Sequence, residues 1–103
     1  MLFMIIEHFT DATAIGERFQ AKGRILPEGL TYQASWVDSS GHRCFQVMEA
    51  PHEESLRPWL AAWNDLVRFD IILVVASANF LVKLLKRRRI IDWYESISNQ
   101  FQR

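Results

Sequence analysis

The sequence predicts an α+β fold whose elements follow the order strand, helix, strand, strand, helix, strand. Three observations predict it. Apolar residues fill two short runs that suit covered strands, Leu2–Phe9 and Phe69–Ala76. Two other segments place apolar residues at helical spacing. Between the helices, Gly29 to Glu49 reads as two strands around a tight turn.

Composition bounds the class of protein. A chain of 103 residues suits one domain with one core, and pairing with a second copy would help it bury more surface. Twelve basic and twelve acidic residues cancel, so no overall field attracts nucleic acid or acidic lipid. A hydrophobic content of 50% excludes disorder, and a single cysteine permits no internal disulfide.

Two apolar stretches could be mistaken for export or membrane signals. The run from Met1 to Ile6 lacks a basic leader and continues into Glu7 and His8, so we do not expect a signal peptide. The run Ile71–Ala76 is far too short to span a bilayer. We therefore expect a soluble, cytoplasmic domain.

The first strand and helix are predicted from the chain before residue 24. Leu2–Phe9 is apolar on both faces for most of its length, as in a central strand. Thr10–Asp11 offers an N-cap and Gly23 a C-terminal cap for the helix that follows. Ile15 and Phe19 are its expected buried contacts.

The hairpin is predicted from its turn. Asp38–Gly41 has turn chemistry, since Asp and Ser bond their own backbone and glycine tolerates positive φ. With these four residues as the loop, the expected cross-strand pairs are Val37 with His42, Ser35 with Cys44, and Gln33 with Gln46.

Side-chain alternation sorts the hairpin into two faces. The apolar face carries Leu30, Tyr32, Ala34, Trp36, Phe45 and Val47, with Arg43 and Glu49 at its ends. The polar face carries Thr31, Gln33, Ser35, His42, Cys44, Gln46 and Met48. We expect the apolar face to pack against the helices. The polar face is then either solvated or directed into a polar cavity.

The second helix and last strand complete the pattern. The apolar stripe of the helix comprises Leu56, Trp59, Leu60, Trp63, Leu66 and Val67. Pro58 is tolerated if Ser55 is the N-cap, because proline then falls in the first turn. Phe69–Ala76 follows as an apolar strand. This order is the ferredoxin-like split β-α-β arrangement, with both helices on one sheet face and the other face open to a partner.

The C-terminal segment forms no part of that unit, so we divide the chain into a domain at 1–78 and a helical extension at 79–103. Apolar residues recur at helical spacing, and we expect a helix against the core or a partner subunit, with Arg89 as its breaking point. The basic cluster comprises Lys86, Arg87, Arg88 and Arg89. Cations near a helix end complement its dipole, so we do not expect nucleic-acid or membrane contact there.

Several motifs together resemble a known family. They are the opening M-L-F-M-I-I-E, the segments L-P-E-G-L and G-x-R-C-F-Q-x-M-E, the S-W before the turn, and W-x-x-x-W-x-D-L-V. They resemble a family of small uncharacterised bacterial proteins, a domain of unknown function, over roughly residues 1 to 78. The resemblance implies the dimeric α/β-barrel superfamily, in which two ferredoxin-like sheets pair face to face. Relatives by fold include muconolactone isomerases and antibiotic-biosynthesis monooxygenases, but shared fold does not imply shared chemistry.

A barrel of this kind would direct the polar hairpin face inward. The candidate ligand-binding residues are Gln33, Ser35, Cys44 and Gln46. The alternative is that they only satisfy polar needs at an interface or face solvent. His42 is two residues from Cys44, too far for a direct bond, so we interpret the cysteine as a buried structural thiol.

Glu7 and His8 end the first strand on opposite faces, so one should point toward the cavity. Such a group could act as an acid or base, although a polar residue at the rim is the commoner case. The three histidines, His8, His42 and His52, show no metal-ligand spacing, and we expect no metal and no cofactor.

Three tryptophans allow specific interpretations. Trp36 beside Arg43 suggests cation–π packing. Trp59 and Trp63, four residues apart, should fill the core, with an aromatic ligand site as the alternative.

Three functions remain open. The first is a small homodimeric barrel that binds a small organic molecule in the cavity between sheets. The second is a cofactor-free isomerase or monooxygenase-like enzyme. The third is a purely structural or interaction module.

Overall fold

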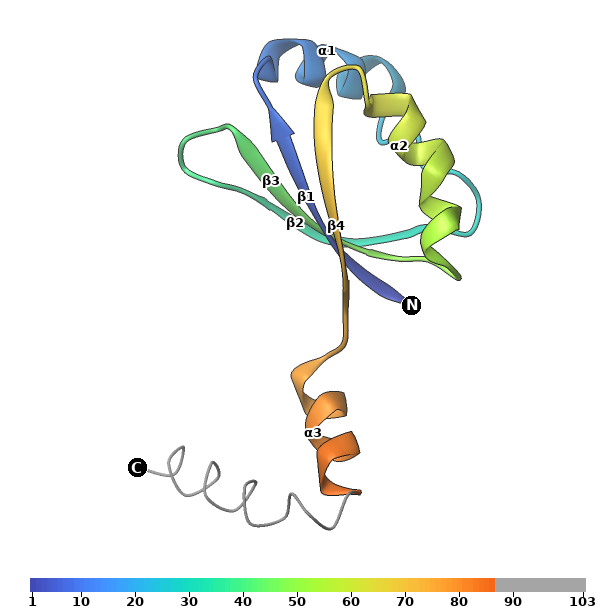
Figure 1. The fold of residues 1–103 in the computed structure, drawn as a ribbon. Coiled ribbons are helices and arrows are strands. Elements are labelled where there is room, and N and C mark those ends of the chain that lie inside the picture. The colour runs from blue at the N-terminus through green and yellow to red at the C-terminus, as the bar shows by residue number, and fades with distance from the viewer. Residues whose placement is uncertain (87–103) are drawn as a thin grey trace.

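The computed structural model describes residues 1–86, which form one four-stranded sheet, three α-helices and a short 3₁₀ turn (Figure 1). The expected break near Arg89, and three members of the basic cluster, lie outside these residues. In chain order the elements are β1 (Leu2–Phe9), α1 (Ala12–Lys22), β2 (Thr31–Val37), β3 (Arg43–Glu49), η1 (Glu53–Leu56), α2 (Arg57–Trp63), β4 (Val67–Val74) and α3 (Ser77–Leu85).

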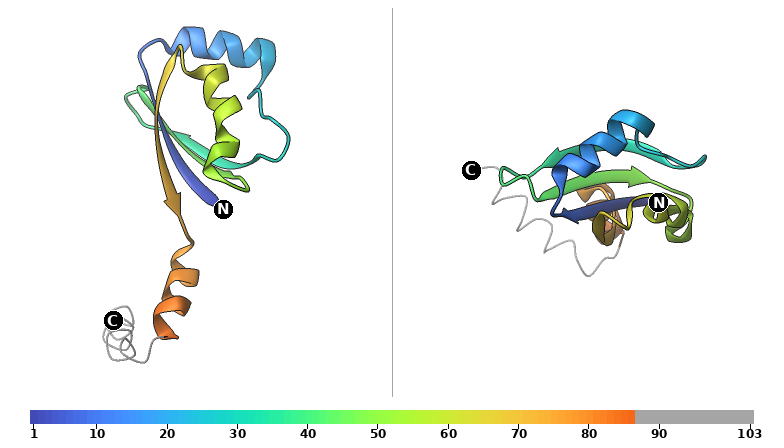
Figure 2. Two further views of the ribbon diagram at one scale, coloured as in Figure 1. Left: turned by 45° about the vertical axis from the view of Figure 1, so that its right-hand side comes forward. Right: turned by 90° about the horizontal axis from the view of Figure 1, so that it is seen from above.

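The sheet has the strand order β2-β3-β1-β4, and every neighbouring pair is antiparallel. Helices α1 and α2 cover one face, and α3 continues beyond the end of β4 (Figures 1 and 2). The predicted α+β, ferredoxin-like arrangement is therefore confirmed, with an additional C-terminal helix.

Local sequence signals account for both ends of α1. The Asp11 side chain accepts a hydrogen bond of 3.0 Å from the backbone N–H of Ala14, as a helix N-cap does. Gly23, at φ 65°, ends the helix, and its N–H donates to the carbonyl of Phe19 at 2.7 Å. Phe19 is less buried than predicted, with 46% of its surface exposed.

Helix α2 begins differently from the prediction. Pro58 does lie in the first turn, where a missing N–H costs little. Ser55 does not cap the helix, because it lies within the 3₁₀ turn η1, and Leu56 stands at the cap position without a side-chain hydrogen bond.

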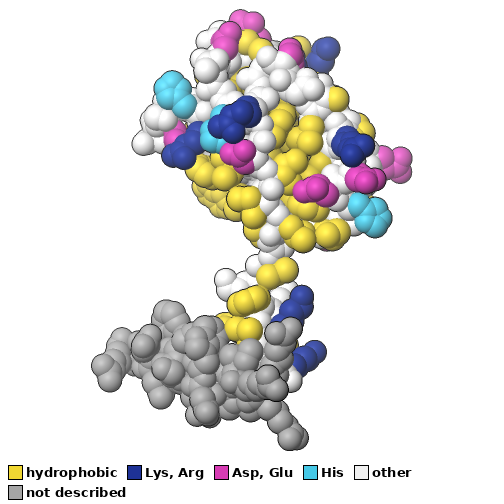
Figure 3. Space-filling view, viewed as in Figure 1, with side chains coloured by type: hydrophobic (Ala, Val, Ile, Leu, Met, Phe, Trp, Pro, Cys, Tyr) yellow, Lys and Arg dark blue, Asp and Glu magenta, His cyan; other side chains and the backbone are white. Residues whose placement is uncertain are grey.

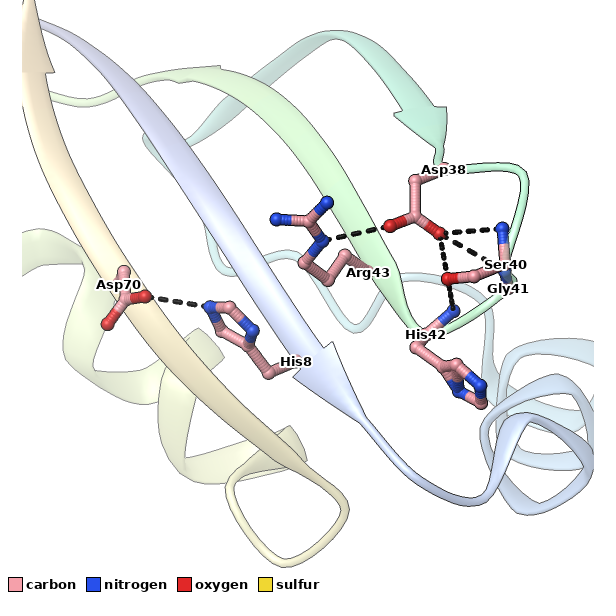
Figure 4. A network of polar contacts seen from close by, with 7 residues as sticks. All are labelled: His8, Asp38, Ser40, Gly41, His42, Arg43 and Asp70. Atoms are coloured by element: carbon pink, nitrogen blue, oxygen red, sulfur yellow. Dashed lines mark hydrogen bonds and ion pairs between the residues drawn. The ribbon is translucent and has the colours of Figure 1, made fainter.

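The hairpin turn has the predicted chemistry and a longer loop. The N–H groups of Ser40 and Gly41 donate to the Asp38 carboxylate at 3.0 and 3.1 Å, and Gly41 has φ 77° (Figure 4). Hydrogen bonds from Ser40 and Arg43 hold the pKa of the Asp38 carboxyl well below its usual range.

The predicted register of the hairpin is wrong by two residues. The observed pairs are Val37 with Cys44, Trp36 with Phe45, and Ser35 with Gln46. An even shift preserves which residues share a face, so the sorting of these residues into faces still holds.

A β-bulge interrupts this alternation near the start of β2. Tyr32 pairs with Met48 and Ala34 pairs with Val47, so Gln33 is the extra residue. Tyr32 consequently lies on the same side of the sheet as buried Met48, although simple alternation placed it with Ala34 and Trp36.

The expectation of which hairpin face meets the helices is wrong. Cys44, Gln46 and Met48 are buried beneath α1 and α2, whereas Trp36 is 59% exposed on the opposite side. The physical reason is that both faces of this sheet are apolar. Hydrophobicity alone therefore did not indicate which one the helices cover.

The core lies between the sheet and the helices. Its fully buried side chains are Phe3, Ile5, Met48 and Leu56, with Trp59 and Trp63 next to them. The predicted packing of the two tryptophans into the core is thus confirmed.

The opposite side of the sheet, here called the open face, carries apolar residues from all four strands. By register they are Leu2, Met4, Ile6, Ala34, Trp36, Phe45, Val47, Ile72 and Val74. Charged groups border them: His8 bonds Asp70 at 2.7 Å, and Arg43 bonds Asp38 at 2.8 Å (Figures 3 and 4). Arg43 lies over the ring of Phe45, at 5.4 Å, and no such contact with Trp36 occurs within residues 1–86.

Helix α3 buries none of its side chains and extends away from the sheet (Figures 1 and 2). Phe80 and Val82 are each 49% exposed. Across the part of the chain that the structure describes, no helix has the length and apolarity needed to cross a membrane.

Candidate ligand-binding site

A cavity of about 220 Å³ lies between the helix-covered face of the sheet and helices α1 and α2. Its lining residues are Glu7, Phe9, Ile15, Phe19, Arg24, Ser35, Val37, Cys44, Gln46, Trp59, Trp63 and Val67. Phe19 and Val37 are 46% and 61% exposed, which places the mouth between α1 and the end of β2. Most of the wall is apolar, and a few polar groups converge within it.

Arg24, in the loop after α1, is held firmly at this wall. The indole N–H groups of Trp59 and Trp63 both donate to its carbonyl oxygen, at 3.2 and 3.0 Å. Its guanidinium carbon lies 3.5 Å from the ring centroid of Tyr32. Backbone and side chain are therefore fixed by separate contacts.

The residue after Arg24 is strained. Ile25 has φ 57°, a left-handed conformation that is unusual for a β-branched residue. Such backbone strain, of order 1–3 kcal/mol, is often found at binding sites. Here it accompanies the turn of the chain that directs Arg24 toward the sheet.

Gln46 is the buried polar residue of this region, with 3% of its surface exposed. Its Oε1 accepts a hydrogen bond of 3.2 Å from Nη1 of Arg24. Its Nε2 is buried and has no hydrogen-bond partner within residues 1–86. Leaving a buried donor unpaired costs about 1–3 kcal/mol, so the unpaired Nε2 calls for a structural or functional explanation.

Glu7 projects from β1 into the same cavity. Burial raises the pKa of its carboxyl from 4.5 to about 7, and the positive charge of Arg24 opposes the shift. Near neutral pH the group can thus both take up and release a proton, as a catalytic acid or base must.

Cys44 and Ser35 form the floor beside Glu7. Burial, and then the nearby Glu7 charge, raise the pKa of the Cys44 thiol to about 11, so it stays protonated at neutral pH. Ser35 Oγ and the Tyr32 hydroxyl share a hydrogen bond of 2.8 Å. These features support the interpretation of Cys44 as a structural thiol.

The structure brings together three of the four candidate ligand-binding residues: Ser35, Cys44 and Gln46. Gln33 does not join them, because the bulge exposes it and its Nε2 donates to Glu49 at 3.3 Å. The cavity also differs from the expected one, since it lies under the helices of one chain.

The candidate acid–base residues separate as their alternation predicts. Glu7 points into the cavity, whereas His8 lies on the open face and bonds Asp70 (Figure 4). Within residues 1–86 no group of three or more His, Cys, Asp or Glu side chains could hold a metal ion.

Sequence reasoning missed Arg24 and Tyr32. Arg24 directly follows the helix-ending Gly23, but a loop has no periodicity from which the direction of a side chain could be predicted. Tyr32 was assigned to the wrong side because the bulge at Gln33 has no clear signature in the sequence.

Comparison with known proteins identifies the family. Residues 1–88 match a family described as a domain of unknown function (DUF3303), and the chain therefore belongs to it. Searches of curated proteins and of solved structures found no match.

Proposed function

We propose that this member of the domain-of-unknown-function family binds a small organic molecule in the cavity between its sheet and helices α1 and α2. The site differs from the one implied by the resemblance to dimeric barrels, which lies between the sheets of two subunits. A mostly apolar cavity with a few convergent polar groups is the usual form of a small-molecule site.

The observation that carries the proposal is the unpartnered Nε2 of Gln46. Because Arg24 donates to Oε1, the amide cannot be turned without losing that bond, and Nε2 must remain a donor. A buried donor of this kind is stabilised when a ligand oxygen, or a water held by the ligand, enters the cavity.

Native mass spectrometry after gentle purification tests the proposal directly. We expect a species heavier than the bare chain, and we expect Gln46→Leu to lose it. Gln33→Leu is the matched control, because Gln33 is the same residue type on the neighbouring strand, outside the cavity. If the wild type is always bare, the structural or interaction role becomes the better explanation.

A second function, cofactor-free acid–base catalysis, is favoured by one observation. Glu7 stands in the cavity with its pKa raised to about 7, which suits a proton shuttle of the isomerase or monooxygenase-like kind. Once a ligand is identified, Glu7→Gln distinguishes the two functions. Loss of turnover with binding retained supports an enzyme, and the absence of any turnover in the wild type supports a binding protein.

We also propose that two chains associate through their open faces. Trp36 and Ile72 are 59% and 47% exposed there, amid apolar neighbours from all four strands. Exposed apolar patches of this kind are typical of interaction sites. The bordering charged pairs, His8–Asp70 and Arg43–Asp38, would form a polar rim.

A further inference from the structure

We infer that the molecule bound in the cavity is a small carboxylate with an apolar body, whose oxygens are held by Arg24 and Gln46. The inference rests on the proposed function and adds the chemical class of the ligand.

Two side chains of the site, Arg24 and Gln46, have hydrogen-bond donors without partners within the described part of the chain. A guanidinium has five N–H donors, and within residues 1–86 the side chain of Arg24 uses one of them, to Oε1 of Gln46. The Nε2 of Gln46 adds another donor without a partner. The Ser35 and Tyr32 hydroxyls share one hydrogen bond, and Glu7 is the carboxyl group of the same cavity. A ligand that complements this wall must supply oxygens, and a planar carboxylate matches the guanidinium fork.

The charge at the wall is fixed in place before a ligand arrives. Stacking on Tyr32 orients the guanidinium, and the two tryptophan N–H bonds anchor the backbone of Arg24. Preorganisation of this kind reduces the entropy lost on binding. An oriented guanidinium also binds an anion through two parallel hydrogen bonds more readily than a flexible surface cation does.

The size and lining of the cavity limit the rest of the molecule. A volume of about 220 Å³ exceeds the roughly 150 Å³ of an apolar protein cavity that accommodates benzene. Apart from the polar cluster, the wall is formed by aromatic and aliphatic side chains, including Phe9, Trp59 and Trp63. A monocarboxylate with a compact aromatic or branched aliphatic body fits both limits.

Glu7 couples this binding to protons. A carboxylate at Arg24 would lie close to Glu7 and repel its ionised form, so binding favours a protonated Glu7. The other charged or titratable groups facing Glu7 are Arg24 from the loop and Cys44 from β3. Helices α1 and α2 present Ile15, Phe19, Trp59 and Trp63 to the cavity, and β4 presents Val67. Affinity should therefore rise as the pH falls through 7.

The experiment compares charged and neutral probes of one shape. Benzoate is matched with benzamide, and hexanoate with hexanamide, and binding is measured by calorimetry or saturation-transfer NMR. At pH 6 we expect each carboxylate to bind at least tenfold more tightly than its amide. We expect the same carboxylate to bind more weakly at pH 8 than at pH 6.

Variants assign that preference to residues. Arg24→Gln should remove the preference for carboxylate, and Glu7→Gln should remove the dependence on pH. Arg68→Gln is the matched control, since Arg68 is an exposed arginine of β4 whose side chain bonds Asp70 outside the cavity. If Arg24→Gln does not fold, the wild-type comparison of acid with amide still decides the question.

The outcomes separate this inference from the proposed function. The carboxylate class is wrong if the amides bind as tightly as the carboxylates. It is also wrong if native mass spectrometry finds a bound neutral molecule and no carboxylate binds. In both cases the proposed small-molecule site still stands. A bare chain by mass spectrometry, together with no binding by any probe, overturns both.

Discussion

Arg24 donates a hydrogen bond of 3.2 Å from Nη1 to Oε1 of Gln46, across 22 positions of sequence. This bond joins the loop after α1 to the middle of β3. It also makes Nε2 the unpaired end of the amide, so the contact that links the cation to β3 also determines which end of the buried amide is left as a donor.

Replacing Gln46 with leucine should leave the unfolding free energy of the ligand-free protein unchanged or raise it by up to about 1 kcal/mol. The substitution loses the Arg24 bond but removes a buried unpaired donor, which costs about 1–3 kcal/mol. Urea denaturation measures the change. A loss of more than about 1 kcal/mol would show that Nε2 is satisfied in solution, and Gln33→Leu provides the exposed control.

Stability should depend on pH through Glu7. Its pKa in the folded chain is raised from 4.5 to about 7, so the folded state binds more protons than the unfolded state between these values. The unfolding free energy then falls as the pH rises through this window, by up to about 3 kcal/mol from this group. Glu7→Gln should remove this component. The unfolding free energy of the variant minus that of the wild type should therefore increase from pH 4.5 to pH 8.

A stability difference between Glu7→Gln and wild type that stays constant with pH would contradict the raised pKa. Denaturant melts at four or five pH values suffice. Glu49→Gln is a matched control, because Glu49 is exposed at the far end of the sheet.

Trp59 and Trp63 should act together on Arg24. Either single change to phenylalanine leaves one N–H on the carbonyl of Arg24 and should cost about 1 kcal/mol. The double variant leaves that carbonyl without either donor, so it should cost more than the sum of the two single changes. A double-mutant cycle by chemical denaturation measures the coupling, and strict additivity would refute it.

Neighbouring residues of β4 test the proposed dimer. Ile72 lies on the open face and Leu73 on the opposite side, and both are substantially exposed, at 47% and 56%. Ile72→Asp should convert a dimer to a monomer, because an unpaired carboxylate would be buried at the interface. Leu73→Asp should leave the dimer intact.

Light scattering after size exclusion gives the mass directly. A wild-type mass near 12.1 kDa, that of one chain, at micromolar concentration would exclude a stable dimer.

Removal of residues 79–103 should weaken the dimer. Helix α3 exposes Phe80, Val82 and Leu85 and buries none of its side chains within the described chain, which suits a segment that packs on a partner. The dissociation constant, measured by analytical ultracentrifugation, should rise severalfold. An unchanged constant would indicate that the extension acts independently of the dimer.

The fold was predictable because its signals are local. The caps at Asp11 and Gly23, the turn at Asp38 and the position of Pro58 each follow from the chemistry of one or two residues, and all occur in the structure. Element order then determines a ferredoxin-like arrangement.

The site was predictable only in part, because its assembly is non-local. Alternation correctly grouped Ser35, Cys44 and Gln46, but a sheet that is apolar on both sides gives no indication of which face the helices cover. Arg24 reaches the cavity through a loop with strained geometry at Ile25, and periodicity does not predict such a path.

The extra residue at Gln33 has a consequence for how this family can vary. Without it, Tyr32 and Ala34 would be neighbours in a regular ladder and would keep their partners Met48 and Val47, so Tyr32 would stay on the side of the guanidinium of Arg24. Pairing Gln33 within a regular ladder would instead turn Tyr32 to the open face and bring Thr31 to its side of the sheet. Relatives that keep an arginine and a tyrosine in these roles should therefore tolerate either many residues at position 33 or the loss of that residue.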